Sequence, residues 1–266
     1  MKKILVLFIL FTFSCKNQSH KILITGELKK WHKVTLTFDG IYSSEYAKEN
    51  PFLNYRLYVT FKNENKKFIV PGYFAADGKS SETSAESGKI WKVHFRPNKT
   101  GSWKYSVSFQ KGKNLSLENL DVEGEPTAFD NLTGEFFIEK SNKTGKDFRG
   151  LGRIQNGGKG YFKFTDIDSI FFKNGTNSPE NFLAYQDFDQ TYRYEVQNRS
   201  GESNPKNLIH KYASHVKDWK QGDPTWKKNK GKGIIGAINY LSSQGVNSIY
   251  MISLNILSDG KDVWPY

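Results

Sequence analysis

Hydrophobic and polar residues alternate in short segments over the first half of the chain. The apolar members of these segments are Ile22, Ile24, Val34, Leu36, Phe38, Leu57, Val59, Phe61, Trp91, Val93, Phe95, Trp103, Tyr105, Val107 and Phe109. A period of two residues is that of a strand with one buried face. Short apolar runs at residues 68–70 and 136–138 add two further strands. Strands of this length and spacing predict an antiparallel β-sandwich domain over residues 21–143, with the alternating apolar side chains inside.

Glycine-rich sequence separates this domain from the rest of the chain. Six glycines fall within residues 144–160, and no strand and helix bracket them as a dinucleotide-binding loop requires. We therefore expect a linker and a hairpin here, with a turn at residues 156–158 and a returning strand at residues 161–164. A second domain is expected over residues 161–266.

In the second domain, helical and strand patterns follow one another. The predicted elements are a strand at 169–173, a loop at 174–192, helices at 205–219 and from Ile234 to a stop at Gly245, and a strand at 246–256. A strand, a helix and a second strand form a βαβ unit, whose strands are expected to be parallel. The pattern therefore predicts the beginning of a (β/α) barrel, a TIM-like architecture.

Polar and aromatic residues follow both predicted strands of this unit. They are Asn181, Tyr185, Asp187, Asp189, Asn255, Asp259, Asp262 and Trp264. The sites of (β/α) barrels lie at the carboxyl ends of their strands, so these residues are the candidates for substrate binding. Carboxylates and amides hydrogen-bond sugar hydroxyls, and aromatic rings stack on sugar rings. A helix cap or a turn is an equally good interpretation of each aspartate.

The N-terminus has the pattern of a lipoprotein signal peptide. Lys2 and Lys3 precede an apolar segment at residues 4–13, and Cys15, the single cysteine of the chain, follows Ser14. Thr12 stands where the commonest lipoprotein motif has leucine. We expect residues 1–15 to direct export, with Cys15 lipidated and the protein anchored in the cell envelope, at the outer membrane or cell surface. A single cysteine also excludes an internal disulfide bond.

The net charge is strongly positive, at +12, with 39 lysines and arginines against 27 acidic residues. An exported basic protein could meet an anionic polysaccharide, although a solvated lysine-rich surface explains most of this charge. The lysines are dispersed and no nucleic-acid-binding motif is visible, so nucleic acid is not an expected partner. His210 and His215 lack the spacing of four residues that places two ligands on one helix face, and neither a metal nor a cofactor is expected.

Six short motifs of the first domain carry a family resemblance. In order, they are NPF at 50–52, YRLYVTF at 55–61, VPGYF at 70–74, WKVHFRP at 91–97, TGSWKY at 100–105 and GEFFI at 134–138. This order resembles the DUF5060-type, immunoglobulin-like domain at the N-terminus of predicted glycoside hydrolases. The resemblance covers residues 27–140, and residues 179–189 and 259–265 resemble the opening of the barrel that follows this domain.

The resemblance implies a glycoside hydrolase that acts on a polysaccharide. Glycoside hydrolysis needs two carboxyl groups, and barrels of this kind supply them from later strands, so the catalytic residues are expected beyond Tyr266 and the chain alone is expected to be inactive. An alternative is a non-catalytic carbohydrate-binding or adhesion module, with Trp31, Tyr42 and Tyr46 as sugar-stacking residues. Core packing or a purely structural spacer is the third interpretation of the sandwich. The sugar, the linkage and the stereochemical outcome stay open.

Overall fold

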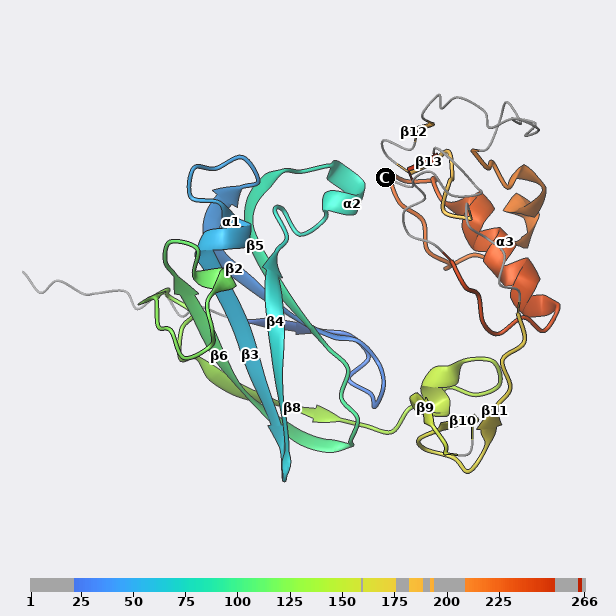
Figure 1. The fold of residues 1–266 in the computed structure, drawn as a ribbon, viewed down its shortest axis with the longest axis horizontal. Coiled ribbons are helices and arrows are strands. Elements are labelled where there is room, and N and C mark those ends of the chain that lie inside the picture. The colour runs from blue at the N-terminus through green and yellow to red at the C-terminus, as the bar shows by residue number, and fades with distance from the viewer. Residues whose placement is uncertain are drawn as a thin grey trace, which may run out of the picture. The chain divides into compact units, whose positions relative to one another are not determined.

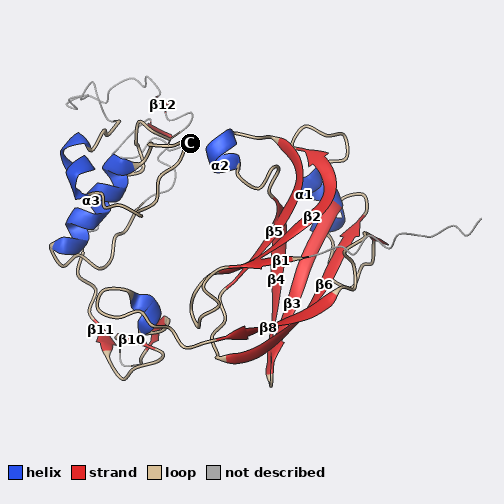
Figure 2. Ribbon diagram, turned by 180° about the vertical axis from the view of Figure 1, so that it is seen from behind, coloured by secondary structure: helices blue, strands red, loops and turns tan. Residues whose placement is uncertain are grey.

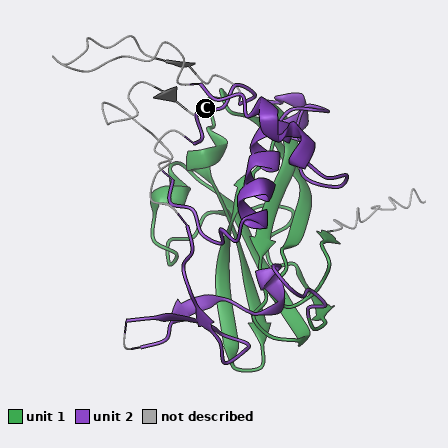
Figure 3. Cartoon of the chain, turned by 90° about the vertical axis from the view of Figure 1, so that its right-hand side faces the viewer, with its two compact units in different colours: residues 1–78, 86–140 green, residues 79–85, 141–266 purple. Residues whose placement is uncertain are grey.

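The structure is a computed structural model that describes residues 22–158, 160–175, 182–188, 192–193, 209–251 and 263–264. Cys15 lies outside the described residues. The chain forms two compact units, the first comprising Met1–Gly78 and Glu86–Lys140 and the second Lys79–Ala85 and Ser141–Tyr266 (Figure 3). No helix in the described ranges is long and apolar enough to cross a membrane.

The first unit is built from antiparallel strands (Figure 1). Its elements are β1 (Leu23–Thr25), β2 (Val34–Ser44), α1 (Pro51–Asn54), β3 (Tyr55–Asn63), β4 (Lys66–Phe74), β5 (Ser87–Phe95), β6 (Gly101–Lys111), the 3-10 helix η1 (Leu115–Leu117), β7 (Glu125–Pro126) and β8 (Thr133–Ile138). The strand order is β1-β2-β5-β4-β3-β6-β7, and β8 also pairs with β6. The sequence prediction of a β-rich first domain is confirmed.

Strand β4 joins the two halves of this curled sheet. It pairs with β3 as far as Tyr58 opposite Pro71 and then with β5 from Gly72 opposite Val93. The halves pack face to face, as the stacked rings of Phe61 on β3 and Phe95 on β5 show, with centroids 4.1 Å apart. The result is consistent with the predicted β-sandwich.

The alternating apolar residues form the core of the first unit. Trp91 is 2% exposed and Trp103 is fully buried at 0%. Each indole N–H donates to a backbone carbonyl, Trp91 to Ile41 and Trp103 to Lys99, both at 3.0 Å. These bonds matter because a buried polar group without a partner would destabilise the fold. The predicted inward face of these strands is therefore confirmed.

The second unit contains shorter elements. They are α2 (Ser80–Thr83), η2 (Phe148–Gly150), β9 (Ile154–Asn156), β10 (Phe162–Phe164), β11 (Ile170–Phe171), β12 (Tyr192–Arg193), η3 (Ala213–Asp218), α3 (Lys232–Ser243) and β13 (Val263–Trp264). Figure 2 shows α3 as the long helix of this unit. Strands β9, β10 and β11 form an antiparallel sheet. The predicted hairpin is present, with Asn156 opposite Phe162 and its side chain accepting from Gly158 N at 2.8 Å.

Two predicted elements differ from the structure where it describes them. Within the helix predicted at 205–219, the described part contains only the 3-10 helix η3, and Tyr212 before it has a left-handed φ of 49° that ends any α-helical continuation. Residues 246–251 of the predicted strand have no strand conformation. The second helix is confirmed as α3, and Gly245 beyond its end has φ 89°, the left-handed conformation typical of a helix stop.

The segments on either side of α3 nevertheless lie side by side. Asn247 N donates to Asn174 O at 2.9 Å, Asn174 N donates to Asn247 Oδ1 at 2.8 Å, and Asn174 Nδ2 donates to Gly245 O at 3.0 Å. These contacts join the carboxyl end of the first predicted strand to the start of the second, whereas parallel strands bring like ends together. The described β11 pairs only with β10, and antiparallel. The (β/α) barrel therefore stays a prediction.

Candidate functional site

Tyr185 is the most deeply buried of the candidate site residues that the structure describes. Its side chain is 1% exposed and belongs to an apolar cluster with Phe182 and Ile234. The rings of Phe188 and Tyr212 lie 5.8 and 5.6 Å from its ring, centroid to centroid. A ring that stacks on a sugar needs at least one face open to solvent. The Tyr185 ring has no such open face.

Asp187 accepts hydrogen bonds from three residues of the second unit. Its Oδ2 accepts from the Tyr185 hydroxyl at 2.6 Å and from Gly231 N at 2.9 Å, and its backbone oxygen accepts from Trp226 Nε1 at 3.1 Å. Gly231 is the N-cap of α3 and has no side chain to satisfy the first N–H groups of the helix. Asp187 accepts from the N–H of this N-cap residue, and the N–H groups of Gly233 and Ile234 in the first turn are directed at the Tyr185 hydroxyl. The negative charge of Asp187 also suits the helix N-terminus.

The hydroxyl of Tyr185 retains its proton in this environment. Burial, and then the hydrogen bond and negative charge of Asp187, raise the pKa of Tyr185 to about 12, although backbone N–H groups of Gly233 and Ile234 act in the opposite direction. A protonated phenol can donate to the Asp187 carboxylate. The two side chains therefore form a helix-capping pair.

This arrangement corrects the prediction that the Tyr185 ring stacks on a sugar, because the ring is buried. Asp187 matches the alternative interpretation as a cap, and its role in sugar binding stays a prediction. Trp264 lies in β13, opposite Tyr192. The remaining candidates lie outside the described residues: Asn181, Asp189, Asn255, Asp259 and Asp262.

The two histidines of the second unit lie apart from any metal-binding arrangement. His215 Nδ1 is 3.0 Å from Asp218 Oδ2, and its ring packs on Tyr240 with centroids 4.8 Å apart. The His210 ring stacks on Tyr212 at 5.0 Å, and burial lowers the pKa of His210. Over the ranges that the structure describes, no three histidine, cysteine or acidic side chains are grouped as a metal site would need.

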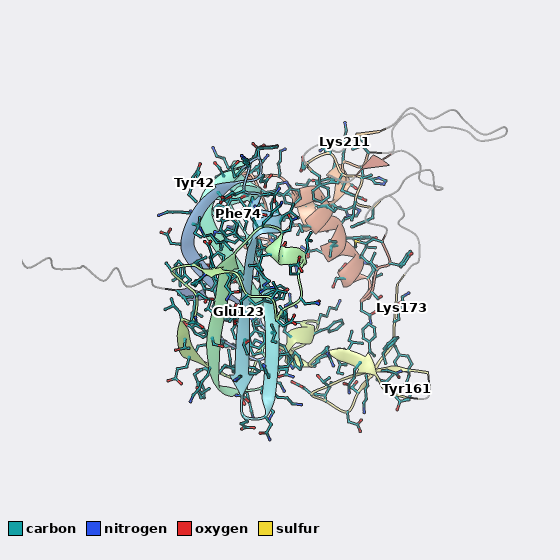
Figure 4. The ribbon with its side chains drawn as sticks, turned by 60° about the vertical axis from the view of Figure 1, so that its left-hand side comes forward. Tyr42, Phe74, Glu123, Tyr161, Lys173 and Lys211 are labelled. Carbon is teal, nitrogen blue, oxygen red and sulfur yellow. The ribbon has the colours of Figure 1, made fainter. Side chains whose placement is uncertain are left out.

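Exposed aromatic side chains occur on the first unit. Tyr42 and Tyr46 are 67% and 78% exposed, so both present rings to solvent, and Tyr42 is labelled in Figure 4. Trp31 is half-buried and has a left-handed φ of 67°, with Lys30 Nζ 5.5 Å from its ring centroid. Tyr42 and Tyr46 are thus available for stacking, as the carbohydrate-binding alternative requires.

A cleft that the sequence did not reveal opens where β4 leaves β3. It encloses about 360 Å³ and is lined by aromatic residues that include Tyr55, Tyr58 and Tyr73. Arg56 also lines it, is 6% exposed, and donates through Nη1 to Asn119 O at 2.7 Å and through Nη2 to Val122 O. The sequence signal for this cleft lies in Tyr58 of YRLY and Tyr73 of PGY, which occupy outward positions of their strands. The change of partner by β4 depends on long-range pairing, which local sequence does not specify.

Comparison with known proteins finds a family match within the first unit. Residues 27–110 match the family model described as "Domain of unknown function (DUF5060)", which confirms the resemblance seen in the sequence. No curated protein matches the chain. Among solved structures, the chain is similar to one described as a putative glycoside hydrolase from Bacteroides vulgatus ATCC 8482, with 21% identity over 58% of this chain and a TM-score of 0.41. The match covers 23% of that chain, so the present chain spans about a quarter of its length.

Proposed function

We propose that this chain, which carries a DUF5060 domain at residues 27–110, is the N-terminal portion of an exported, lipid-anchored glycoside hydrolase that acts on a polysaccharide. The DUF5060 domain is the observation that carries the proposal, because the sequence resemblance links such domains to hydrolases of this kind. The signal-like residues 1–15 support export and anchoring through Cys15.

Catalysis would come from groups beyond those described. A glycosidase places two carboxyl groups about 5 Å apart for retention of configuration or roughly 6.5 to 9.5 Å apart for inversion. Asp187 is already engaged with Tyr185 and Gly231, so it is a poor member of such a pair. We therefore expect the substrate-binding role to fall to Asn181, Asp189, Asn255, Asp259, Asp262 and Trp264, and the acid and nucleophile to come from later barrel strands.

The test has a genetic and an enzymatic part. The coding sequence is read beyond the codon for Tyr266, and both the chain and any longer product are assayed for release of reducing ends from a panel of polysaccharides. We expect the longer product to contain two strand-end carboxylates and to hydrolyse one of the substrates, while the chain alone does not. A stop codon directly after Tyr266, or a longer product inactive on every polysaccharide, would argue against hydrolysis.

A non-catalytic carbohydrate-binding module is the second candidate, favoured by the exposed rings of Tyr42 and Tyr46. Its test is binding of the chain to a glycan array, repeated with Trp31→Ala, Tyr42→Ala and Tyr46→Ala. Loss of binding in these variants, with binding retained in Phe172→Ala, supports it. Phe172 is a suitable control because it is an aromatic residue of the second unit that is 76% exposed.

A further inference from the structure

Three cations lie along the outer side of the ladder of β2 and β5, Lys92 within it and Lys33 and Arg96 just beyond its end. On β5, Val93 and Phe95 point into the core with exposures of 0% and 5%, so Lys92 and the residues beyond it at alternate positions face outward. Val34 pairs with Phe95, which places Lys33 beside Arg96 at the end of the same ladder. We call Lys33, Lys92 and Arg96 the cationic strip. The strands that carry it are labelled in Figure 2.

The positive charge of the strip is not compensated locally. Within the part of the chain that the structure describes, no carboxylate lies at ion-pair distance from any of its three members. Lys92 Nζ donates instead to a backbone oxygen, that of Gly78, at 2.6 Å. Asp39 lies further along β2, and its carboxylate is already paired with Lys89 at 2.9 Å. The strip therefore offers charge to an external anion.

An aromatic ring is held next to these cations. Tyr73 on β4 pairs directly with Lys92, and its side chain is 44% exposed. Its hydroxyl lies 2.9 Å from His94 Nε2, and His94 Nδ1 lies 2.9 Å from Thr35 Oγ1. Burial, Lys33 and Lys92 lower the pKa of His94, which favours the neutral imidazole that can link two hydroxyls. The Tyr73 ring is thus fixed in orientation before any ligand arrives, which reduces the entropy lost on binding.

Tyr73 also lines the cleft between β3 and β4. The cleft volume of about 360 Å³ falls within the range of small-ligand sites. Tyr58 and Ser116 contribute to its wall, so hydroxyl groups are present as well as aromatic surface. Tyr73 is therefore shared between the wall of this cleft and the strand pair that carries Lys92.

We propose that this face of the first unit binds an acidic saccharide, with a sugar ring stacked on Tyr73 and its carboxylate or sulfate group against the cationic strip. The proposal rests on the proposed function, since it assumes that the protein acts on a polysaccharide, and it specifies an anionic one. A saccharide fits better than a single-stranded nucleic acid, because sites for the latter stack successive bases on several aromatic rings along a basic groove. Here Lys92 is flanked on the neighbouring strands by Thr37 and Tyr73, so a single ring is paired with the strip.

The test is affinity electrophoresis of the chain in gels that contain polygalacturonate, with a neutral β-glucan in parallel gels. We expect the polyuronate to retard the chain. Tyr73→Ala should weaken retardation about tenfold, the equivalent of losing one stacked ring. Lys92→Gln and Arg96→Gln should each weaken it and reduce its dependence on salt, whereas Tyr73→Phe, which keeps the ring, should retain most of the binding.

Two controls separate a specific site from general charge attraction. Lys104→Gln removes the same charge from an exposed position on β6, in the other half of the sandwich, and should leave retardation unchanged. Poly-L-glutamate and single-stranded DNA of similar charge should bind more weakly than polygalacturonate and should not respond to Tyr73→Ala. Circular dichroism of each variant checks that the sandwich is intact.

The outcomes distinguish this proposal from the proposed function. Binding of the neutral glucan alone would overturn the acidic-saccharide site and leave an action on polysaccharides standing. Binding of poly-L-glutamate or DNA as tight as that of polygalacturonate would overturn the site as a saccharide site. A loss of retardation in Lys104→Gln as large as that in Lys92→Gln would do so too. Hydrolysis of only neutral substrates by a longer product would do the same, whereas polyuronate binding through Tyr73 by a product without hydrolase activity would sustain the site alone.

Discussion

At the scale of single residues, the Tyr185 and Asp187 pair shows how a sequence that resembles a binding loop serves the fold. The tyrosine packs in a small aromatic cluster, and its hydroxyl donates to the carboxylate that caps α3. An aspartate in a polar loop can either cap a helix or bind a substrate, so the sequence alone does not distinguish the two roles. Experiments on these two residues therefore decide between the roles.

Replacing Asp187 by asparagine should destabilise the second unit. The substitution removes the charge and leaves one amide oxygen for two donors, the Tyr185 hydroxyl and Gly231 N. We expect the free energy of unfolding to fall by about 1–3 kcal/mol in urea titrations. Asp168→Asn is the matched control, since Asp168 is an exposed acid of the same unit. Unchanged stability with loss of glycan binding would instead assign Asp187 to the substrate.

Tyr185 should make the protein sensitive to strongly alkaline pH. Its pKa of about 12 in the folded state is above the value near 10 of an unfolded tyrosine. The folded state therefore binds the proton more tightly, and this stabilisation is complete below about pH 10 and is lost as the pH rises towards 12. Burial also raises the pKa of Tyr212, so ultraviolet titration of tyrosinate should show more than one late-ionising group. The group near pH 12 should disappear in Tyr185→Phe and persist in Tyr250→Phe. Titration of that group near pH 10 would contradict the burial described here.

The sequence could identify these residues but not their partners. The sequence marks Tyr185 and Asp187 as candidate binding residues because they follow a predicted strand in a polar-aromatic loop. Their contacts with Gly231 and Trp226 join positions about forty residues apart, and local patterns carry no information on such pairs. By contrast, Trp91 and Trp103 were placed in the core correctly, because strand alternation fixes the face on which a side chain lies.

At the scale of elements, the packing of α3 against η3 depends on glycine. A Cβ at Gly236 would lie 1.9 Å from His215 O, and one at Gly233 would lie 2.6 Å from Lys211 O. These glycines let the helix approach the backbone of the segment before it. The two glycines of the GIIG sequence therefore lower the helix propensity of α3 but permit this close packing.

Gly236→Ala tests this balance. Alanine favours an isolated helix by about 1 kcal/mol, but the clash with His215 O requires the two elements to separate. We expect a net loss of stability of about 1–3 kcal/mol, measured by chemical denaturation. Ser243→Ala, at an exposed position of the same helix, should not show this loss. A more stable Gly236→Ala protein would mean that α3 and η3 are further apart than described.

The elements also show which features of the fold are local. The period of apolar residues located α3 and most strands of the first unit, and a glycine after the helix located its end. The 3-10 helix η3 was predicted as part of a longer α-helix, because the left-handed backbone of Tyr212 is a tertiary effect that its residue type does not indicate. The order β2-β5-β4-β3 similarly results from pairing between distant strands.

At the scale of the whole molecule, two separate cores stabilise the two units. The first core contains Leu36 with 0% exposure, and the second contains Ile234 with 4% exposure. Truncating either to alanine should cost about 2–5 kcal/mol because it leaves a cavity. Since each side chain packs within its own unit, each substitution is expected to act on that unit.

Hydrogen exchange measured by mass spectrometry can follow the units separately. Leu36→Ala should accelerate amide exchange in the β2, β5 and β3 peptides, while α3 peptides keep their protection. Ile234→Ala should do the reverse, since Phe182, Tyr185 and Ile234 form one cluster. The comparison is internal, so unequal expression or purity of the two variants does not affect it. Simultaneous loss of protection in both units from either substitution would show that they unfold as one cooperative body, and then the acidic-saccharide face and the capped helix could not be altered independently.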